Sequence, residues 1–401
     1  MKGSKMIYLD NSATTRPYDE VIHEMRRMQE ECFGNPSSLH RMGLQAEMAL
    51  RSARKKVADA LHADPGELLF TGSGSEADNT ALFGGAYANR RRGNKIIVTA
   101  IEHPAVLTAC QKLERDGFTV AVIGVDRHGL VDLDELKRTV DASTILVSVM
   151  AVNNELGTVQ PLEAIGNILQ NIGGILFHTD GVQAMGKIPV DLAACHLDLM
   201  SVSAHKIHGP KGVGALYVKK GTKLEPLIYG GGQEHGLRGG TENTPGIVGF
   251  GIAAEQQQKN QEARIDQIQL VRTHLMSELK DKIEDCVINS PENVWGQDSV
   301  ENGVSSPSIL NVSFPGCRGE VLLHTLEQKE IFVSTGAACS SRKKASQVLT
   351  AAGLPAALTE SAIRFSISEF NTTEEMDVVV ATLATATEGM RNLRRRTNLG
   401  R

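Results

Sequence analysis

Short apolar stretches alternate with longer stretches of helical character between about residues 66 and 218. The apolar stretches are rich in Val, Ile and Leu, and each is about as long as a buried strand. They lie at 95–99, 119–125, 145–150, 174–178, 197–202 and 214–218. Strands that alternate with helices in this way predict a mostly parallel α/β sheet.

The pattern changes near residue 255, where the sequence becomes polar but keeps apolar residues three or four positions apart. These residues are Ile265, Ile268, Val271, Leu275 and Leu279. Their spacing predicts a long amphipathic helix over about 255–283, which leaves the first domain. Strand candidates at 309–314 and 362–368 and a helix candidate at 320–330 predict a second domain.

The chain is long enough to form more than one domain. It has 401 residues, of which 41% are hydrophobic, and a single core stops growing at roughly 250–300 residues. The patterns predict a large α/β domain with a mostly parallel central sheet, followed by a second, smaller domain.

Polar residues follow several of the predicted strands directly. Glu102 and His103 follow the first strand, residues 153–155 the third, residues 179–180 the fourth and residues 203–206 the fifth. In open α/β sheets, ligands bind beyond the carboxyl ends of the strands. We therefore expect these polar residues to converge on one site.

The charge balance favours small-molecule chemistry. A net charge of −5 lacks the basic excess of a nucleic-acid or membrane-surface binder. No apolar run approaches the roughly 18 residues that a membrane span needs, and the N-terminal residues contain no long apolar segment. We expect a cytoplasmic protein without a direct nucleic-acid or membrane partner.

The cysteines are expected to be reduced thiols. They are Cys32, Cys110, Cys195, Cys286, Cys317 and Cys339. They lie far apart and form no CxxC pair, so they predict neither a disulfide framework nor a zinc ribbon. The histidines His103, His205 and His208 also lack the spacing of metal ligands, and no metal site is expected.

A phosphate site is indicated by the polar, glycine-containing segment 70–79, which follows an apolar run and precedes a predicted helix at 76–89. Free backbone N–H groups at a helix start bind phosphate, and Gly72 and Gly74 would allow close approach while Ser75 adds a hydroxyl. The segment matches neither the dinucleotide nor the Walker pattern. An ordinary helix cap is the alternative interpretation.

Asp180 and Lys206 indicate a more specific kind of site than the phosphate-binding segment does by itself. They end two successive apolar runs that are separated by one crossover length. An enzyme that uses pyridoxal phosphate (PLP) needs a lysine to form a Schiff base and an acid to keep the pyridine nitrogen protonated. The alternative is a surface lysine and a helix cap, but His205 next to Lys206 within residues 201–212 favours the cofactor site.

The chain resembles the cysteine desulfurases of the NifS and IscS type. The matching segments occur in register over nearly the whole chain, and only its ends are left uncovered. Because so many motifs appear in the same order, the resemblance is highly specific. The segments are 8–15, 33–37, 102–103, 152–157, 178–183, 203–206, 239–241 and 334–340.

The resemblance implies a PLP-dependent transferase fold, known as fold type I, with a large α/β domain at 15–260 and a smaller α+β domain that combines residues 1–14 with residues 261–401. It also implies a role for each matching residue. Lys206 would hold PLP as a Schiff base, and Asp180 would pair with the pyridine nitrogen. Gln183 would bond the phenolic oxygen and Asn154 would lie beside the ring and contact the substrate. His103 would stack on the ring and transfer protons.

The resemblance also implies a phosphate cradle that two subunits share. Gly74, Ser75, Ser203 and His205 would hold the phosphate, and Thr241 would reach in from a second subunit. A homodimer is therefore expected.

The implied reaction removes sulfur from L-cysteine and releases L-alanine. Arg364 would grip the substrate carboxylate, a task that suits a planar bidentate donor. Cys339, in a loop of small residues at about 334–346, would attack the sulfur as a thiolate, with His103 or the basic run 342–344 as its activator. The resulting persulfide would pass to an acceptor protein, such as an iron–sulfur scaffold or a tRNA-thiolation enzyme.

The chain departs from the family pattern in three places. The segment 340–346 is shorter and more basic than is common, which leaves the acceptor open. Ser368 and Glu369 stand where many relatives carry Gly-Arg, and His208 stands where an aromatic residue is frequent. No role is assigned to His208.

Three other functions remain as alternatives to cysteine desulfuration. Another PLP enzyme of the same fold, an aminotransferase or selenocysteine lyase, would share much of the site. An inactive assembly scaffold would not need Lys206, Asp180, His103 and Cys339 together. A simple phosphate-binding module would lack the PLP chromophore.

Overall fold

The computed structural model describes residues 6–296, 303–336 and 346–399. Its centre is a seven-stranded sheet with the order β2-β8-β7-β6-β5-β3-β4, in which β8 runs against both neighbours and the other pairs are parallel. The strands are β2 (Leu68–Thr71), β3 (Lys95–Thr99), β4 (Thr119–Ile123), β5 (Thr144–Ser148), β6 (Leu176–Asp180), β7 (Leu199–Ser203) and β8 (Gly214–Val218). The predicted α/β class with a mostly parallel sheet is confirmed.

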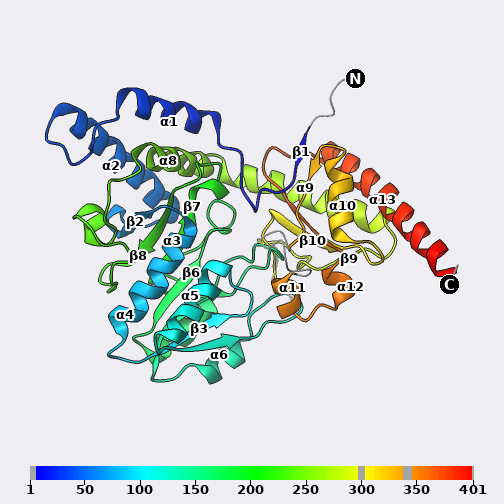
Figure 1. Cartoon of the computed structure of the whole chain (residues 1–401), viewed down its shortest axis with the longest axis horizontal. Coiled ribbons are helices and arrows are strands. Elements are labelled where there is room, and N and C mark those ends of the chain that lie inside the picture. Colours follow the sequence, from blue (N-terminus) through cyan, green and yellow to red (C-terminus); the bar gives the residue numbers. More distant parts are fainter. Residues whose placement is uncertain (1–5, 297–302, 337–345, 400–401) are drawn as a thin grey trace.

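Helices cover both faces of this sheet, as Figure 1 shows. They are α1 (Asp19–Glu31), α2 (Arg41–Leu61), α3 (Gly74–Asn79), α4 (Gly85–Asn89), α5 (Pro104–Arg115), α6 (Leu133–Thr139), α7 (Leu162–Ile172) and α8 (Thr244–Gln258). Each amphipathic helix buries residues three or four positions apart, as α7 does with Leu162, Ile165 and Leu169. A π-turn over Thr80–Gly84 joins α3 to α4, so the helix predicted at 76–89 is present.

The rest of the chain packs around a separate hydrophobic core beside the large sheet (Figure 1). A three-stranded antiparallel sheet has the order β12-β10-β9, and a parallel pair joins β1 to β11. The elements are β1 (Ile7–Tyr8), β9 (Val287–Ile288), β10 (Ile309–Ser313), β11 (Ile331–Phe332), β12 (Ala362–Ser366), α9 (Gln261–Lys282), α10 (Gly319–Glu327), α11 (Gln347–Ala351), α12 (Ala356–Thr359) and α13 (Thr373–Leu399). The N-terminal residues Ile7 and Leu9 belong to this second core. The domain boundaries at 14/15 and 260/261 stay predictions.

The helix predicted over about 255–283 is divided in the structure. The helix α8 ends at Gln258 and α9 begins at Gln261. Between them Asn260 has a φ of 51°, a left-handed conformation that asparagine tolerates better than most residues and that a continuous helix does not accept. The sequence pattern missed this break because residues on both sides have helical spacing.

Arg272 ties α9 to the neighbouring chain from inside the second core. Its side chain is fully buried, and its guanidinium donates to the carbonyl oxygens of Ile309 and Pro291 at 3.1 and 2.9 Å and to Ser305 Oγ at 2.8 Å. A buried charge is tolerated only where such acceptors surround it. These bonds join α9 to β10 and to the chain between β9 and β10.

Across the described ranges, the structure contains no helix that is both long and apolar enough to cross a membrane.

Candidate active site

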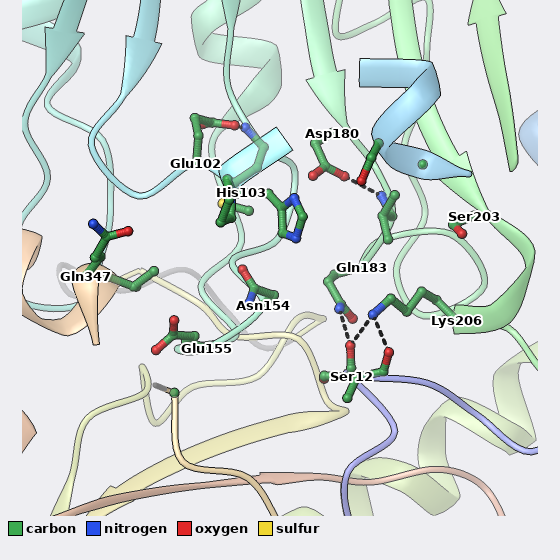
Figure 2. A pocket seen from close by; sticks show the side chains of 18 of the residues that line it. Ser12, Glu102, His103, Asn154, Glu155, Asp180, Gln183, Ser203, Lys206 and Gln347 are labelled. Atoms are coloured by element: carbon green, nitrogen blue, oxygen red, sulfur yellow. Dashed lines mark hydrogen bonds between the residues drawn. The ribbon is translucent and has the colours of Figure 1, made fainter. Parts of the chain in front are cut away.

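A cavity of about 610 Å³ lies between the carboxyl ends of the large sheet's strands and the second core. That volume is typical of a site for a small molecule or cofactor. Figure 2 shows its polar side chains pointing toward one another from different elements. The predicted residues that line it are Gly74, Ser75, His103, Asn154, Asp180, Gln183, Ser203, His205, Lys206 and Arg364. The polar strand ends therefore converge on one cavity, as expected.

Two predicted site residues stand apart from this group. Thr241 is exposed and is absent from the described lining of the cavity. Cys339 lies outside the described residues. The described residues nearest to it along the chain, Gly336 and Ser346, both line the cavity.

Lys206 ends the short 3-10 helix Ala204–Lys206, which follows β7 directly. Its amine donates to the carbonyl oxygens of Ser12 and Ala13 at 2.5 and 2.8 Å. The segment between β1 and α1 therefore reaches across the cavity and meets the amine, as Figure 2 shows for Ser12. An N-terminal segment far away in sequence thus forms part of the lysine's environment.

Asp180 is the last residue of β6 and is buried. Burial raises its pKa, while the neighbouring His103, the Val182 N–H and Lys206 act in the opposite direction. A carboxyl group whose charge is disfavoured by burial becomes ionised most readily when a cation lies against it. Asp180 is therefore suited to pair with a protonated ring nitrogen.

His103 caps the start of α5, and Pro104 occupies the first helical position. Its Nδ1 accepts from the Ala105 N–H at 3.1 Å, so the neutral ring carries its proton on Nε2. Burial lowers the pKa of His103, Asp180 opposes that effect and Lys206 adds to it. The lowered pKa favours the neutral ring, which has a proton to donate from Nε2.

The anion end of the cavity is formed where α3 begins. Ser73 caps the helix through its side chain, and Gly74 leaves no room for a larger residue, because a Cβ there would lie 2.8 Å from Val182 Cγ2. Across the cradle, Ser203 Oγ is buried without a hydrogen-bond partner among the described residues. An unpaired hydroxyl beside helix N–H groups is ready to bind phosphate.

Arg364 enters the cavity from β12 on the second-core side. Its Nη1 donates to the Asn154 carbonyl at 3.0 Å and its Nη2 to Asp10 Oδ1 at 2.7 Å. Its Nε is buried and has no partner within the described structure. The guanidinium is thus held in place by two contacts while one donor stays available for a carboxylate.

Glu102 lines the cavity, as expected from its place after the first predicted strand, but no role was predicted for it. Thr99 Oγ1 and the Met150 N–H donate to its Oε1 at 2.6 and 2.9 Å, and its Oε2 has no partner in the described part of the chain. Burial raises the pKa of Glu102 to about 8. The carboxyl group is therefore neutral at pH 7. Its place directly before His103 in the segment 102–103 was the signal available in the sequence.

Glu155 is a second cavity residue without a predicted role. Ser346 Oγ donates to its Oε2 at 2.5 Å, and Gly336 lies against the same oxygen. Asn153 Oδ1 accepts from the backbone N–H groups of Glu155 and Leu156 and so shapes the turn that aims Glu155 inward. Glu155 therefore contacts both described flanks of the segment that contains Cys339.

In the ranges that the structure describes, no group of three or more His, Cys, Asp or Glu side chains is arranged to hold a metal ion.

Comparison with known proteins adds to this geometry. The aminotransferase class-V family model matches residues 7–379. The chain belongs to this family. The IscS cysteine desulfurase of Clostridium botulinum is 43% identical over 381 residues, which cover 95% of this chain and 94% of that protein.

Two solved structures are similar over most of their length. One described as a NifS-like protein is 40% identical with a TM-score of 0.88, and the match covers 96% of this chain and 100% of that one. SspA in complex with cysteine is 34% identical with a TM-score of 0.77, and the match covers 91% and 100%. Within the class-V family the chain is thus one of the cysteine desulfurases of IscS and NifS type.

Family membership implies PLP as the cofactor, and the cavity residues fit that molecule. The Ser203 hydroxyl and the start of α3 suit its phosphate, and buried Asp180 suits its ring nitrogen. The Lys206 amine suits its aldehyde. The donor set thus contains a partner for each functional end of the cofactor.

Proposed function

We propose that this cysteine desulfurase moves the sulfur of L-cysteine to Cys339 and releases L-alanine. In the net reaction the carbon–sulfur bond of the substrate breaks and a sulfur–sulfur bond forms on Cys339. The substrate carbon that loses the sulfur gains the hydrogen of the Cys339 thiol, which gives alanine. The sulfur stays on Cys339 as the persulfide. The observation that carries the proposal is that Lys206, Asp180 and His103 meet in one cavity.

Lys206, Asp180 and Gln183 would hold the reactive part of PLP, with Asn154 beside the ring. Lys206 would bind the aldehyde carbon, Asp180 the ring nitrogen and Gln183 the phenolic oxygen. When bound, the cofactor supplies an electron-withdrawing ring that accepts electrons from the substrate carbons. The buried setting of Asp180 supports its role, because a cation against this carboxyl would stabilise its ionised form.

Gly74, Ser75, Ser203 and His205 would hold the phosphate. Burial, with the Lys206 charge as the next cause, lowers the pKa of His205 to about 4. Its neutral ring can donate one hydrogen bond to the phosphate. The remaining donors are the hydroxyl groups and the N–H groups at the start of α3.

Arg364 would bind the substrate carboxylate beside Asn154. The unpartnered Nε supports this role, because a buried donor without an acceptor gains the full free energy of a new charge-assisted bond. His103 would hold a proton on Nε2 next to the substrate, and Lys206 would move protons between its carbons. Both groups line the same cavity, and their positions support the assignment.

The other cysteines are poorly placed for sulfur transfer. The described lining of the cavity contains no cysteine. Burial raises the pKa of the Cys110 thiol to about 12 and that of the Cys195 thiol to about 11, which disfavours the reactive thiolate. Gly336 and Ser346, which flank the segment with Cys339, line the cavity. These observations support Cys339 as the sulfur carrier.

We further propose a cytoplasmic homodimer with the domain boundaries given above. Thr241 is exposed and away from its own cavity, which is compatible with a contribution to a second copy's phosphate site. The persulfide would pass to an acceptor protein, either an iron–sulfur scaffold or a tRNA-thiolation enzyme. The relative named SspA is described in complex with cysteine, which supports L-cysteine as the substrate.

The test is incubation of the purified protein with L-cysteine and a reductant, followed by measurement of alanine and sulfide. Lys206→Ala should lose both products and the visible absorbance of bound PLP. Cys339→Ala should lose both products but keep the absorbance, and the matched control Cys195→Ala should remain active. Full activity of Cys339→Ala would refute the persulfide mechanism and favour a lyase or aminotransferase.

A further inference from the structure

A buried lysine lies behind the cavity, in the turn that follows β6. Lys187 is only 8% exposed, and its amine donates to Gln183 Oε1 at 2.8 Å. Within the described ranges, no carboxylate forms an ion pair with it. Lysine is seldom buried without such a pair, because removing the charge from water is costly.

The electrostatic surroundings of Lys187 make its position still more costly. Burial lowers its pKa to about 7, and the positive charges of Lys206 and Arg364 act in the same direction, whereas Glu369 opposes them. A residue that only filled space here would be more stable as methionine or leucine. The contact with Gln183 is therefore the feature to explain.

Two contacts at opposite ends of the Gln183 amide decide its orientation. Lys187 donates to its oxygen, and its Nε2 donates to the Ser12 carbonyl at 2.9 Å. The Ser12 carbonyl has no donor, and the Lys187 amine has no acceptor while it carries its proton, so in that state a flipped amide could make neither bond. Figure 2 shows Gln183 and Lys206 directed at Ser12 from the same side.

The orientation matters for what Gln183 can offer the cofactor. An amide NH2 group has two hydrogens, and Ser12 uses one of them. The other can be donated to an oxygen with negative charge, which an amide oxygen in its place would repel. The side chain of Gln183 lines the cavity, so its donor group is the one available there.

We propose that Lys187 is a positioning residue that acts through Gln183, by holding the amide so that its NH2 group donates to the phenolic oxygen of PLP. This inference rests on the proposed function, in which Lys206 and Gln183 hold the cofactor. A donated hydrogen bond lowers the affinity of the phenolic oxygen for the proton that it shares with the Lys206 nitrogen. Loss of Lys187 weakens the hydrogen bond from Gln183 to the phenolic oxygen. The affinity of that oxygen for the shared proton then rises.

The experiment follows the visible absorbance of bound PLP in the purified holoenzyme as pH is raised, which requires no turnover. In Lys187→Met the midpoint of the spectral change should rise by about 0.5 to 1 unit, a roughly 3- to 10-fold change in proton affinity. Lys95→Met is the matched control, because Lys95 donates to Asp141 at the far end of β3. It should keep the wild-type midpoint.

A double-mutant cycle separates action through Gln183 from a direct charge effect. If Lys187 acts through Gln183, adding Lys187→Met to Gln183→Met should not shift the midpoint further. Additive shifts, or a wild-type midpoint in Lys187→Met, would overturn the proposal. If Lys187→Met fails to fold, Lys187→Gln should shift the midpoint in the same direction by a smaller amount. An unchanged midpoint in Lys187→Gln would also overturn the proposal.

The proposed function is tested separately in the same titration. If Lys206→Ala keeps the wild-type spectrum, the cofactor assignment is wrong and the inference about Lys187 fails with it. If Lys206→Ala loses that spectrum while Lys187→Met keeps the wild-type midpoint, only the inference about Lys187 is overturned.

Discussion

Replacement of Gly336 by alanine tests whether Glu155 organises the cavity wall beside the segment with Cys339. A Cβ at position 336 would lie 1.9 Å from Glu155 Oε2 and 2.8 Å from its Cδ, well inside van der Waals contact. Glu155 is buried, and Ser346 Oγ donates to the same oxygen at 2.5 Å. Gly336→Ala must therefore displace Glu155 and weaken its bond to Ser346.

The magnitude follows from the cost of overpacking. An extra methyl group in a packed site costs about 1–3 kcal/mol. Because the strain falls on the cavity wall, we expect it to reduce kcat/KM for alanine formation by about 5- to 150-fold, the ratio that corresponds to that free energy. The phosphate cradle at Gly74 and Ser203 is formed by other elements, so binding of PLP should be retained.

Gly389→Ala provides the same chemical change without a clash. Gly389 is exposed in α13, and a Cβ there would meet no atom within 4 Å. Alanine in a helix interior is more stable than glycine by about 0.5–1 kcal/mol, so this variant should gain stability and keep full activity. The measurements are kcat/KM, the absorbance of PLP and Tm for both variants. The reasoning about Glu155 is wrong if Gly336→Ala binds PLP and matches Gly389→Ala in kcat/KM.

Three further predictions concern other buried groups. His103→Asn should lower kcat by about 10²- to 10⁴-fold, the usual contribution of a proton-transfer group, without loss of PLP absorbance; unchanged kcat would exclude that role. Burial raises the pKa of Glu102 from 4.5 to about 8, so its contribution to stability is complete below pH 4.5 and is lost as pH rises through about 8. Urea unfolding at about pH 5 and pH 9 should show a larger loss of free energy of unfolding for wild type than for Glu102→Gln, and equal losses would contradict this. Arg272→Met leaves the carbonyls of Ile309 and Pro291 without their donor and should lower the free energy of unfolding by about 2–6 kcal/mol, from about 1–3 kcal/mol for each buried acceptor left unpaired; a loss below about 1 kcal/mol would show that these bonds contribute little.

Much of the large sheet was predictable because local pattern and tertiary role agree there. The apolar runs at 95–99 and 214–218 coincide with β3 and β8, since strands buried on both faces are apolar throughout. The other predicted strands differ by a few residues at their ends. The division between α8 and α9 was missed, because a single left-handed residue, Asn260, interrupts the helix without changing the hydrophobic period.

The candidate site was predictable as far as its residues lie in short motifs at strand ends. His103 and Lys206 follow strands of one sheet and Asp180 ends another strand of it, and parallel strands bring their carboxyl ends to the same edge. Glu155 was expected at the site but no role was predicted for it, and Lys187 was missed. Their importance depends on burial and on contacts with Ser346 and Gln183, and nothing in the local pattern reveals these contacts.

The sequence by itself determined the fold class, the order of the motifs and the chemistry of their side chains, because these depend on local periodicity and residue type. Only the tertiary structure decided which distant groups meet. Arg364 Nη2 lies 2.7 Å from Asp10 Oδ1. His208 and Glu369 both depart from the family pattern, and His208 Nε2 lies 3.4 Å from Glu369 Oε2. Such pairings are selected by the packing of whole elements around two cores, and the free energy of a buried charge depends on the neighbours that this packing supplies.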